Sequence, residues 1–369
     1  LGRPDVTVVG APLLLHAAWG RLAGPSEAWR LAVRAGDQTE AGALVASAVL
    51  TVPPGTELVR VRASSPGSRP HEALVRVPGE RAVGLRTRTV RTGEHELFRV
   101  DALPVGAEWS SISRPVTVGP VPVLVLPRAL PLPVVPLPPR LQGLTGAHSA
   151  GRPGEGGDFH DVHPFVPGDR LRRVDWRTTG RRAARTGGRT LELYVRRTRA
   201  TADATVMLVM DSRDDVGPDV ATWAGAGSVR SDEPTSLDLA RQAAASLARG
   251  YLDGGDRVGL EDLGRRRRPV RPAAGSRHLE RVVRRLALSR AERQPGPRHR
   301  APQIPSGALV VVLSTFLDGE AARMAHLWRR AGHRVLAVDV LPEVREGDLD
   351  ARLRTAYRLV RMEREDRLT

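Results

Sequence analysis

From Thr205 to the end of the chain, short apolar runs alternate with amphipathic stretches, and this alternation constrains the fold more than any other feature of the sequence. The first run, Thr205–Met210, is continuously apolar and ends at Asp211, which is typical of a strand buried on both faces. The spacing predicts strands over residues 205–210, 257–263, 308–313 and 334–340 and helices over 235–252, 276–288, 319–331 and 349–362. Strands and helices in this order predict an α/β domain with a mainly parallel sheet and helices on both faces.

The part before residue 128 has a different period. Apolar and charged residues alternate around Trp29 and Val33 and again around Val59 and Val61, and Pro-Gly pairs separate the runs. Short period-two strands between such turns favour an antiparallel β-sandwich of the immunoglobulin-like kind. A sheet packed within a larger α+β unit is the alternative. The fold class is therefore predicted as α+β multidomain, with the sandwich over residues 1–128.

Residues 129–157 are rich first in proline and then in glycine, which predicts an extended linker. The glycines match neither the P-loop pattern nor the dinucleotide-binding pattern, so a phosphate-binding role is not expected. The α/β domain, including the segment that leads into it, is predicted to occupy residues 158–369.

Composition excludes several kinds of chemistry. The 369 residues include no cysteine, which rules out disulfides, thiolate metal sites and cysteine nucleophiles. The net charge of +16 comes entirely from arginine, in a pattern typical of a GC-rich genome, but it still favours anionic partners such as the inner face of a membrane. No apolar stretch reaches the roughly 20 residues of a membrane span, so any transmembrane anchor is expected to be missing from this chain.

The most distinctive segment lies between the linker and the first parallel strand. A glycine turn is followed by interleaved aspartate, arginine and tryptophan, a combination that suits an ion-pair network with guanidinium stacked on an indole ring. We expect its charged side chains and Trp176 to form a connected, substantially buried cluster that binds this segment to the α/β domain, and a ligand- or partner-binding surface is the alternative. Its candidate residues are Gly168, Asp169, Arg170, Arg173, Asp175 and Trp176.

This segment resembles the hallmark of the DUF58 family, a Gly-Asp pair followed by arginine and an Asp-Trp pair. The resemblance covers about residues 150–345, although His163-Pro164-Phe165 stands where the family often has Arg-x-Tyr. It implies a von Willebrand factor A-like fold, anchorage by N-terminal transmembrane helices, and association with AAA+ ATPases of the MoxR type. No catalytic activity is established for the family as a whole.

A von Willebrand factor A-like fold implies a metal site after its first strand, with hydroxyl and carboxylate ligands. The corresponding positions here are Asp211, Ser212, Asp215 and Ser314. Arg213 stands where the first hydroxyl ligand is needed, so the sequence predicts a degenerate site without metal, and no other cofactor. The alternative is that Asp211 anchors its loop or caps a helix.

These observations predict a non-enzymatic protein-interaction scaffold. It is expected at the cytoplasmic side of the cell membrane, working with a MoxR-type AAA+ ATPase in the assembly or maturation of other proteins. The alternative is a basic nucleic-acid-binding protein, and the scarcity of aromatic residues for base stacking argues against it. A hydrolase is disfavoured because no nucleophile–base pair can be named. The acidic loop 212–234 is expected to be a partner-binding loop or a mobile insertion.

Overall fold

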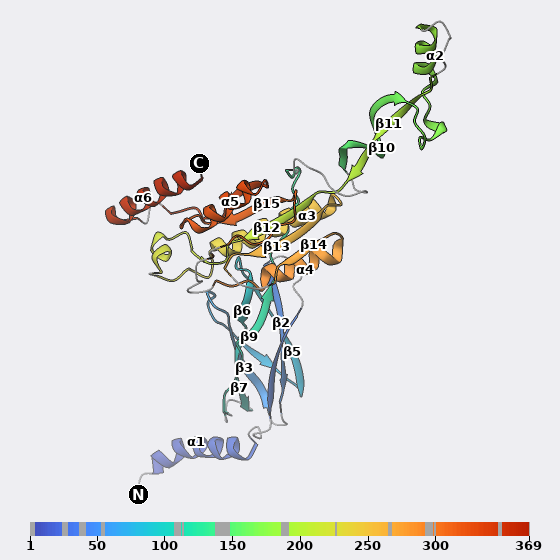
Figure 1. The fold of residues 1–369 in the computed structure, drawn as a ribbon. Coiled ribbons are helices and arrows are strands. Elements are labelled where there is room, and N and C mark those ends of the chain that lie inside the picture. The colour runs from blue at the N-terminus through green and yellow to red at the C-terminus, as the bar shows by residue number, and fades with distance from the viewer. Residues whose placement is uncertain are drawn as a thin grey trace. The chain divides into compact units, whose positions relative to one another are not determined.

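The computed structural model describes residues 4–23, 29–36, 42–52, 56–106, 112, 114–136, 148–185, 192–225, 227–264, 268–291, 298, 300–345 and 349–368. They divide into two compact units, each described here by itself. The first unit comprises residues 1–127, 217–238 and 287–289, and the second comprises 128–216, 239–286 and 290–369. Figure 1 labels the helices and strands.

Antiparallel strands build most of the first unit. They are β1 (Arg30–Ala35), β2 (Ala43–Thr51), β3 (Thr56–Ser64), β4 (His71–Arg76), β5 (Glu80–Arg88), β6 (Gly93–Leu97), β7 (Arg99–Gly106), β8 (Val116–Val118) and β9 (Val121–Val125). Three sheets form, with the orders β1-β2-β5, β4-β3-β7-β8 and β6-β9. All of their pairings are antiparallel, so the prediction of antiparallel strands in this part is confirmed.

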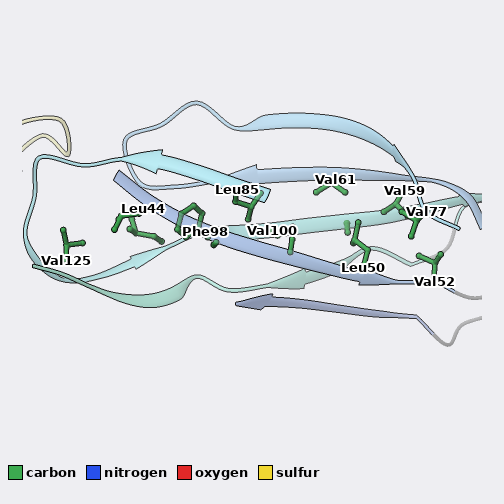
Figure 2. Close-up of a cluster of buried hydrophobic side chains, with 14 residues drawn as sticks. Leu44, Leu50, Val52, Val59, Val61, Val77, Leu85, Phe98, Val100 and Val125 are labelled. Atoms are coloured by element: carbon green, nitrogen blue, oxygen red, sulfur yellow. The ribbon is translucent and has the colours of Figure 1, made fainter. Parts of the chain in front are cut away.

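One apolar core joins these sheets (Figure 2). Along β2 every second side chain is buried, from Leu44 to Leu50, because successive residues of a strand point to opposite faces. Val59 of β3 and Val100 of β7 enter the same core and are both fully buried. The period-two pattern seen in the sequence is thus the pattern of burial.

The first helix, α1 (Pro4–Ala23), was not predicted. Its seven large apolar side chains of described placement are 61–86% exposed and lie around the whole helix, so no stripe of period 3.6 marks it in the sequence. They are Val8, Val9, Leu13, Leu14, Leu15, Trp19 and Leu22. Among the described residues, no helix has both the length and the apolar character that a bilayer crossing requires.

A mixed five-stranded sheet is the centre of the second unit. Its strands are β12 (Thr205–Met210), β13 (Arg257–Asp262), β14 (Val270–Ala273), β15 (Leu309–Ser314) and β16 (Arg334–Asp339), in the order β14-β13-β12-β15-β16. The pairings β12–β13, β12–β15 and β15–β16 are parallel, and β13–β14 is antiparallel. The four predicted strands are confirmed. The edge strand β14 was missed because its four residues carry no run of apolar side chains.

The helices that alternate with these strands were also predicted. They are α3 (Ser236–Asp253), α4 (Ser276–Ala287), α5 (Glu320–Arg330) and α6 (Ala351–Leu368). Helix α5 buries Met324 and Trp328 in an apolar cluster with Val310 and Val312 of β15. The predicted helix boundaries agree with the structure to within a few residues, except that α6 continues to Leu368.

The proline-rich part of the predicted linker lies against helix α3 within the second unit. The Tyr251 hydroxyl donates to the Pro136 carbonyl at 2.6 Å, and the Leu130 N–H donates to the Ser246 hydroxyl at 2.9 Å. Residues 137–147 lie outside the described residues. Residues 148–157, predicted as the glycine-rich end of the linker, belong to strand β10 (His148–Pro164).

Strand β10 pairs antiparallel with β11 (Tyr194–Ala202), and the connection between them carries η2 (Leu171–Arg173) and helix α2 (Trp176–Arg185). The register shifts repeatedly between Ser149 and Asp161. Gly154 lies so close to the backbone of Ala200 that a Cβ atom would collide with it. Close approach of two strands, rather than linker flexibility, therefore explains this glycine.

Candidate functional site

Polar side chains gather where the parallel strands end. Asp211 follows β12, Asp262 is the last residue of β13, and Ser314 is the last residue of β15. The Ser314 hydroxyl donates to Asp211 Oδ2 at 2.7 Å, and the Ser212 hydroxyl donates to Asp262 Oδ1 at 2.6 Å. Because the carboxyl ends of parallel strands lie at one edge of the sheet, three separate strands supply this group. We call it the carboxyl-edge cluster: Asp211, Ser212, Arg213, Asp214, Asp262, Ser314, Thr315 and Asp318.

Arg213 is the centre of this cluster. Its Nε and Nη2 donate to the two oxygens of Asp211 at 2.8 and 2.7 Å, and its Nη1 and Nη2 donate to Asp318 at 2.6 and 3.0 Å. The side chains of Arg213 and Asp211 are only 7% and 2% exposed. Burial alone would lower the pKa of Arg213, but the hydrogen bonds and charges of Asp211 and Asp318 raise it above its ordinary value. The guanidinium is therefore a fixed positive charge between two carboxylates.

In two further carboxylates of the cluster, burial disfavours the charged form. Burial raises the pKa of Asp214, and the nearby Asp211 charge raises it further, although the Thr315 hydroxyl donates to Asp214 at 3.1 Å. Burial likewise raises the pKa of Asp262 despite the hydrogen bond from Ser212. The cluster thus holds several acids near one another and compensates them with a single buried guanidinium, which leaves the negative charge of Asp214 disfavoured.

We expect Asp214→Asn to raise the melting temperature at neutral pH. The raised pKa means that the charged carboxylate costs stability at pH values above that pKa, and that the cost disappears as the pH falls and Asp214 becomes protonated. An asparagine oxygen still accepts the Thr315 hydrogen bond without the charge. Thermal unfolding of both proteins across a pH series should show a gap that narrows toward acid. The exposed Asp158→Asn is the control, and a gap that widens toward acid would contradict the prediction.

The residues predicted as a degenerate metal site are partly brought together. Asp211 and Ser314 share a hydrogen bond, whereas Ser212 donates to Asp262 instead, and Asp215 is half-buried in the loop after β12. Arg213, which stands at the position of the first hydroxyl ligand, pairs with Asp211 at 2.7 Å. Among the described residues, no group of three or more histidine and carboxylate side chains is arranged to hold a metal ion.

Calorimetric titration of the chelator-treated protein with Mg²⁺ or Ca²⁺ should detect no tight binding at Asp211. The positive charge of Arg213, held within hydrogen-bond distance of both Asp211 oxygens, repels a cation from the oxygens that would have to coordinate it. Micromolar binding that disappears in Asp211→Ala would show that the guanidinium moves aside for a metal.

The hallmark segment has its own hydrogen bonds. Gly168 has a φ of +107°, a conformation that glycine tolerates and other residues rarely adopt. Asp169 accepts a hydrogen bond from the Val166 N–H at 3.0 Å, and Asp175 accepts one from the Thr178 N–H at 2.9 Å at the start of α2. These two aspartates shape the turn and the helix start, and Arg173 donates to the Gly154 carbonyl at 3.4 Å.

The expectation that Trp176 is buried with these charges is wrong, because its side chain is 68% exposed. The buried aromatic residue of this region is instead Tyr194, whose ring lies under the Arg182 guanidinium at 4.7 Å. Arg170 is also exposed. Of the two interpretations that the sequence allows, a buried cluster and a binding surface, the exposure of Trp176 favours the second.

A family model described as "Protein of unknown function DUF58" matches residues 161–354. The chain belongs to the DUF58 family. The matched range begins within β10, contains the whole hallmark segment and the whole mixed sheet, and ends in α6, so the resemblance seen in the hallmark run is confirmed at the level of the family.

Other comparisons add little to the DUF58 assignment. No curated protein matches the chain. A solved β-glucosidase of glycoside hydrolase family 3 from Bifidobacterium adolescentis is 13% identical over 30% of the chain, with a TM-score of 0.15, and the chain covers 19% of its length. A similarity of this size carries no argument about fold or function.

The sequence did not identify the arginines that hold the carboxyl edge of this DUF58 protein. Arg298 donates to the carbonyls of Leu263 and Asp262 at 3.0 and 2.7 Å, and Arg364 and Arg367 of α6 donate to the backbone after β15. Nothing distinguishes these arginines among the 57 basic residues of the chain. Only the spatial arrangement separates them from arginines on the surface.

Proposed function

We propose that this DUF58 protein is a non-enzymatic protein-interaction scaffold that is held at the cytoplasmic side of the cell membrane. It works with an AAA+ ATPase of the MoxR type in the assembly or maturation of other proteins. The ATPase docks at the carboxyl edge of the mixed sheet, where ligands of open α/β sheets generally bind.

The position of Arg213 is the observation that carries this proposal. At the edge where an α/β enzyme places its metal or nucleophile, an internal guanidinium joins Asp211 to Asp318. The Asp318 carboxylate remains 52% exposed, whereas the Arg213 and Asp211 side chains are 7% and 2% exposed. An exposed acid on a rigid, charge-paired base suits recognition of a basic surface on a partner protein.

The order of strands and the place of Asp211 support the finer assignment to a von Willebrand factor A-like fold. The sheet order β14-β13-β12-β15-β16 places β12 in the centre, and its carboxyl end carries the aspartate that begins the degenerate metal motif. In this proposal the domain keeps the architecture of a ligand-binding fold and replaces the cation by an arginine.

Helix α1 supports the membrane association. Its large apolar side chains, such as Leu14 at 73% and Leu22 at 86% exposure, have no apolar surroundings within the described part of the chain. Burial in lipid removes such surface from water at about 25 cal/mol per Å². The membrane is therefore the environment in which we place this helix.

The partnership is tested with the full chain and the purified MoxR-type AAA+ ATPase of the same organism. Biolayer interferometry with ATP present should show saturable binding, and Asp318→Asn should weaken it several-fold because the exposed charge is lost while Asp211 still holds Arg213. The control is Asp253→Asn, which removes a carboxylate that is 68% exposed at the end of α3. Absence of binding by the unaltered chain, or equal weakening by both variants, would contradict the proposal.

Nucleic-acid binding is the second candidate, favoured by the arginines of α2, which holds four arginines and no acid. Phosphate contacts would make retention on duplex DNA fall steeply with salt. If the chain binds duplex DNA at physiological salt with such a slope, this candidate replaces the scaffold.

A further inference from the structure

The connection between β10 and β11 has an unusual surface. We call residues 164–185 the hallmark tip. Fourteen of its residues are exposed; six are arginine, and the other eight are tryptophan, leucine, valine, alanine, proline or glycine. No exposed residue of the hallmark tip carries a hydroxyl, an amide or a carboxylate side chain.

The two aspartates of the hallmark tip do not neutralise this surface. Asp169 accepts a hydrogen bond from the Val166 N–H, and its Oδ2 lies 3.4 Å from His163 Nε2. Asp175 accepts a hydrogen bond from the Thr178 N–H. Against them stand seven arginines. Arg177, Arg181 and Arg185 make no side-chain ion pair with any described residue. The hallmark tip therefore carries a net positive charge at its surface.

Helix α2 arranges these side chains in two neighbouring stripes. Trp176, Gly180 and Ala184 follow one another at intervals of four and are all exposed, so they form a stripe along one side of the helix. Arg177, Arg181 and Arg185 repeat at the same interval and form the adjacent stripe. Helix α2 buries only Thr179.

Exposed apolar residues extend beyond the helix. Leu171 in η2 is 67% exposed and Val166 is 51% exposed, and Trp176 of α2 is 68% exposed. Large apolar side chains in water at three positions of one short connection indicate a surface that is covered in use.

We propose that the hallmark tip binds the surface of an anionic lipid bilayer. Trp176, Leu171 and Val166 enter the interfacial layer, and the arginine stripe contacts lipid phosphates. The composition favours lipid over nucleic acid, because a nucleic acid offers phosphates and base edges but no apolar layer that would bury exposed leucine and valine. A tryptophan at the headgroup level with arginines beside it is typical of an interfacial surface.

This proposal is independent of the ATPase partnership, because it concerns a different surface. Vesicle binding through helix α1 is distinguished from binding through the hallmark tip by a fluorescent label. The label reports only the surroundings of the residue that carries it, and α1 is the same in every protein compared. The chain has no cysteine, and Ala184→Cys therefore gives one labelling position on the tryptophan stripe. Ser68→Cys, exposed in the turn after β3, is the matched labelling control.

Each protein carries an environment-sensitive fluorophore on this cysteine and is titrated with vesicles. Equimolar phosphatidylglycerol and phosphatidylcholine vesicles should shift the emission of the label at residue 184 to the blue, whereas pure phosphatidylcholine should not. The label at residue 68 should stay unchanged. In the labelled background, Leu171→Ser with Trp176→Ser should weaken the response about tenfold because the apolar insertion is lost. These exposed substitutions should leave the melting temperature unchanged, which separates lost binding from lost folding.

The electrostatic part is tested by Arg177→Gln with Arg181→Gln, which should weaken the response about tenfold or more. Arg277→Gln with Arg281→Gln, an exposed pair at the same spacing on α4, should leave it unchanged. A label at residue 184 that ignores anionic vesicles, or that responds equally to zwitterionic ones, would overturn the proposal. A response to duplex DNA or to an acidic protein without a response to vesicles would assign the hallmark tip to that partner instead.

Discussion

Arg213→Met is expected to lower the free energy of unfolding by about 3–5 kcal/mol. The substitution leaves the Asp211 carboxylate, only 2% exposed, without the guanidinium that now holds both of its oxygens. An unpaired charge in a buried position is one of the most destabilising changes a single residue can produce. Urea unfolding at neutral pH, followed by circular dichroism, measures the loss.

Two further variants show whether the loss comes from the charge. Adding Asp211→Asn to Arg213→Met should recover most of the stability, because asparagine can still accept from Ser314 without a buried charge. Arg230→Met removes a guanidinium that is 60% exposed and pairs with Asp232 and Glu233, and it should cost less than about 1 kcal/mol. If the double variant is no more stable than Arg213→Met, the charge is not the cause.

Phe316→Ala should also cost about 3–5 kcal/mol, because the ring is 1% exposed and packs in the cluster that contains Met324 and Trp328. Its backbone adds a sharper expectation. Phe316 has a φ of +51°, where any side chain costs free energy and glycine does not. Phe316→Gly should therefore be about 0.5–1 kcal/mol more stable than Phe316→Ala, despite the greater flexibility of glycine in the unfolded chain.

Met324 provides the control for this comparison, since it is fully buried in the same cluster but lies in α5. Met324→Ala should be more stable than Met324→Gly by about 1 kcal/mol, because alanine has the higher helix propensity. Chemical denaturation of the four variants tests both orders at once. The same order at both positions would mean that the backbone at Phe316 is not strained in solution.

The sequence predicted the mixed sheet well because its two central strands β12 and β15 each contain five consecutive apolar residues. Every residue of β15 is buried, and a short apolar run flanked by helical patterns is typical of such a strand. Helix α1 was missed because its apolar side chains surround it and show no period. Helix α2 was missed because ten residues with four arginines and only Thr179 buried have no apolar stripe.

The candidate sites were predicted as residues but not as contacts. The sequence located Asp211 and Ser314 from their places at strand ends, and the hallmark run from its composition. It could not show that Arg213 turns back to Asp211 and on to Asp318, because residue 318 is 105 positions away. The exposure of Trp176 was also hidden, since a tryptophan among charged residues fits a buried cluster and a binding surface equally well.

The contacts of α6 make the end of the chain part of the carboxyl edge. Arg364 donates to the Thr315 carbonyl at 2.8 Å and pairs with Asp339, and Arg367 donates to the carbonyls of Phe316 and Leu317 at 3.2 and 2.6 Å. These carbonyls belong to the loop that leads to Asp318, so docking of α6 and the conformation of this loop are thermodynamically linked. Any ligand that binds only one conformation of the loop changes the docking equilibrium of α6 by the same factor by which α6 changes the affinity for that ligand. The rate of amide hydrogen exchange in α6 should therefore report whether a ligand is bound at the carboxyl edge of the sheet.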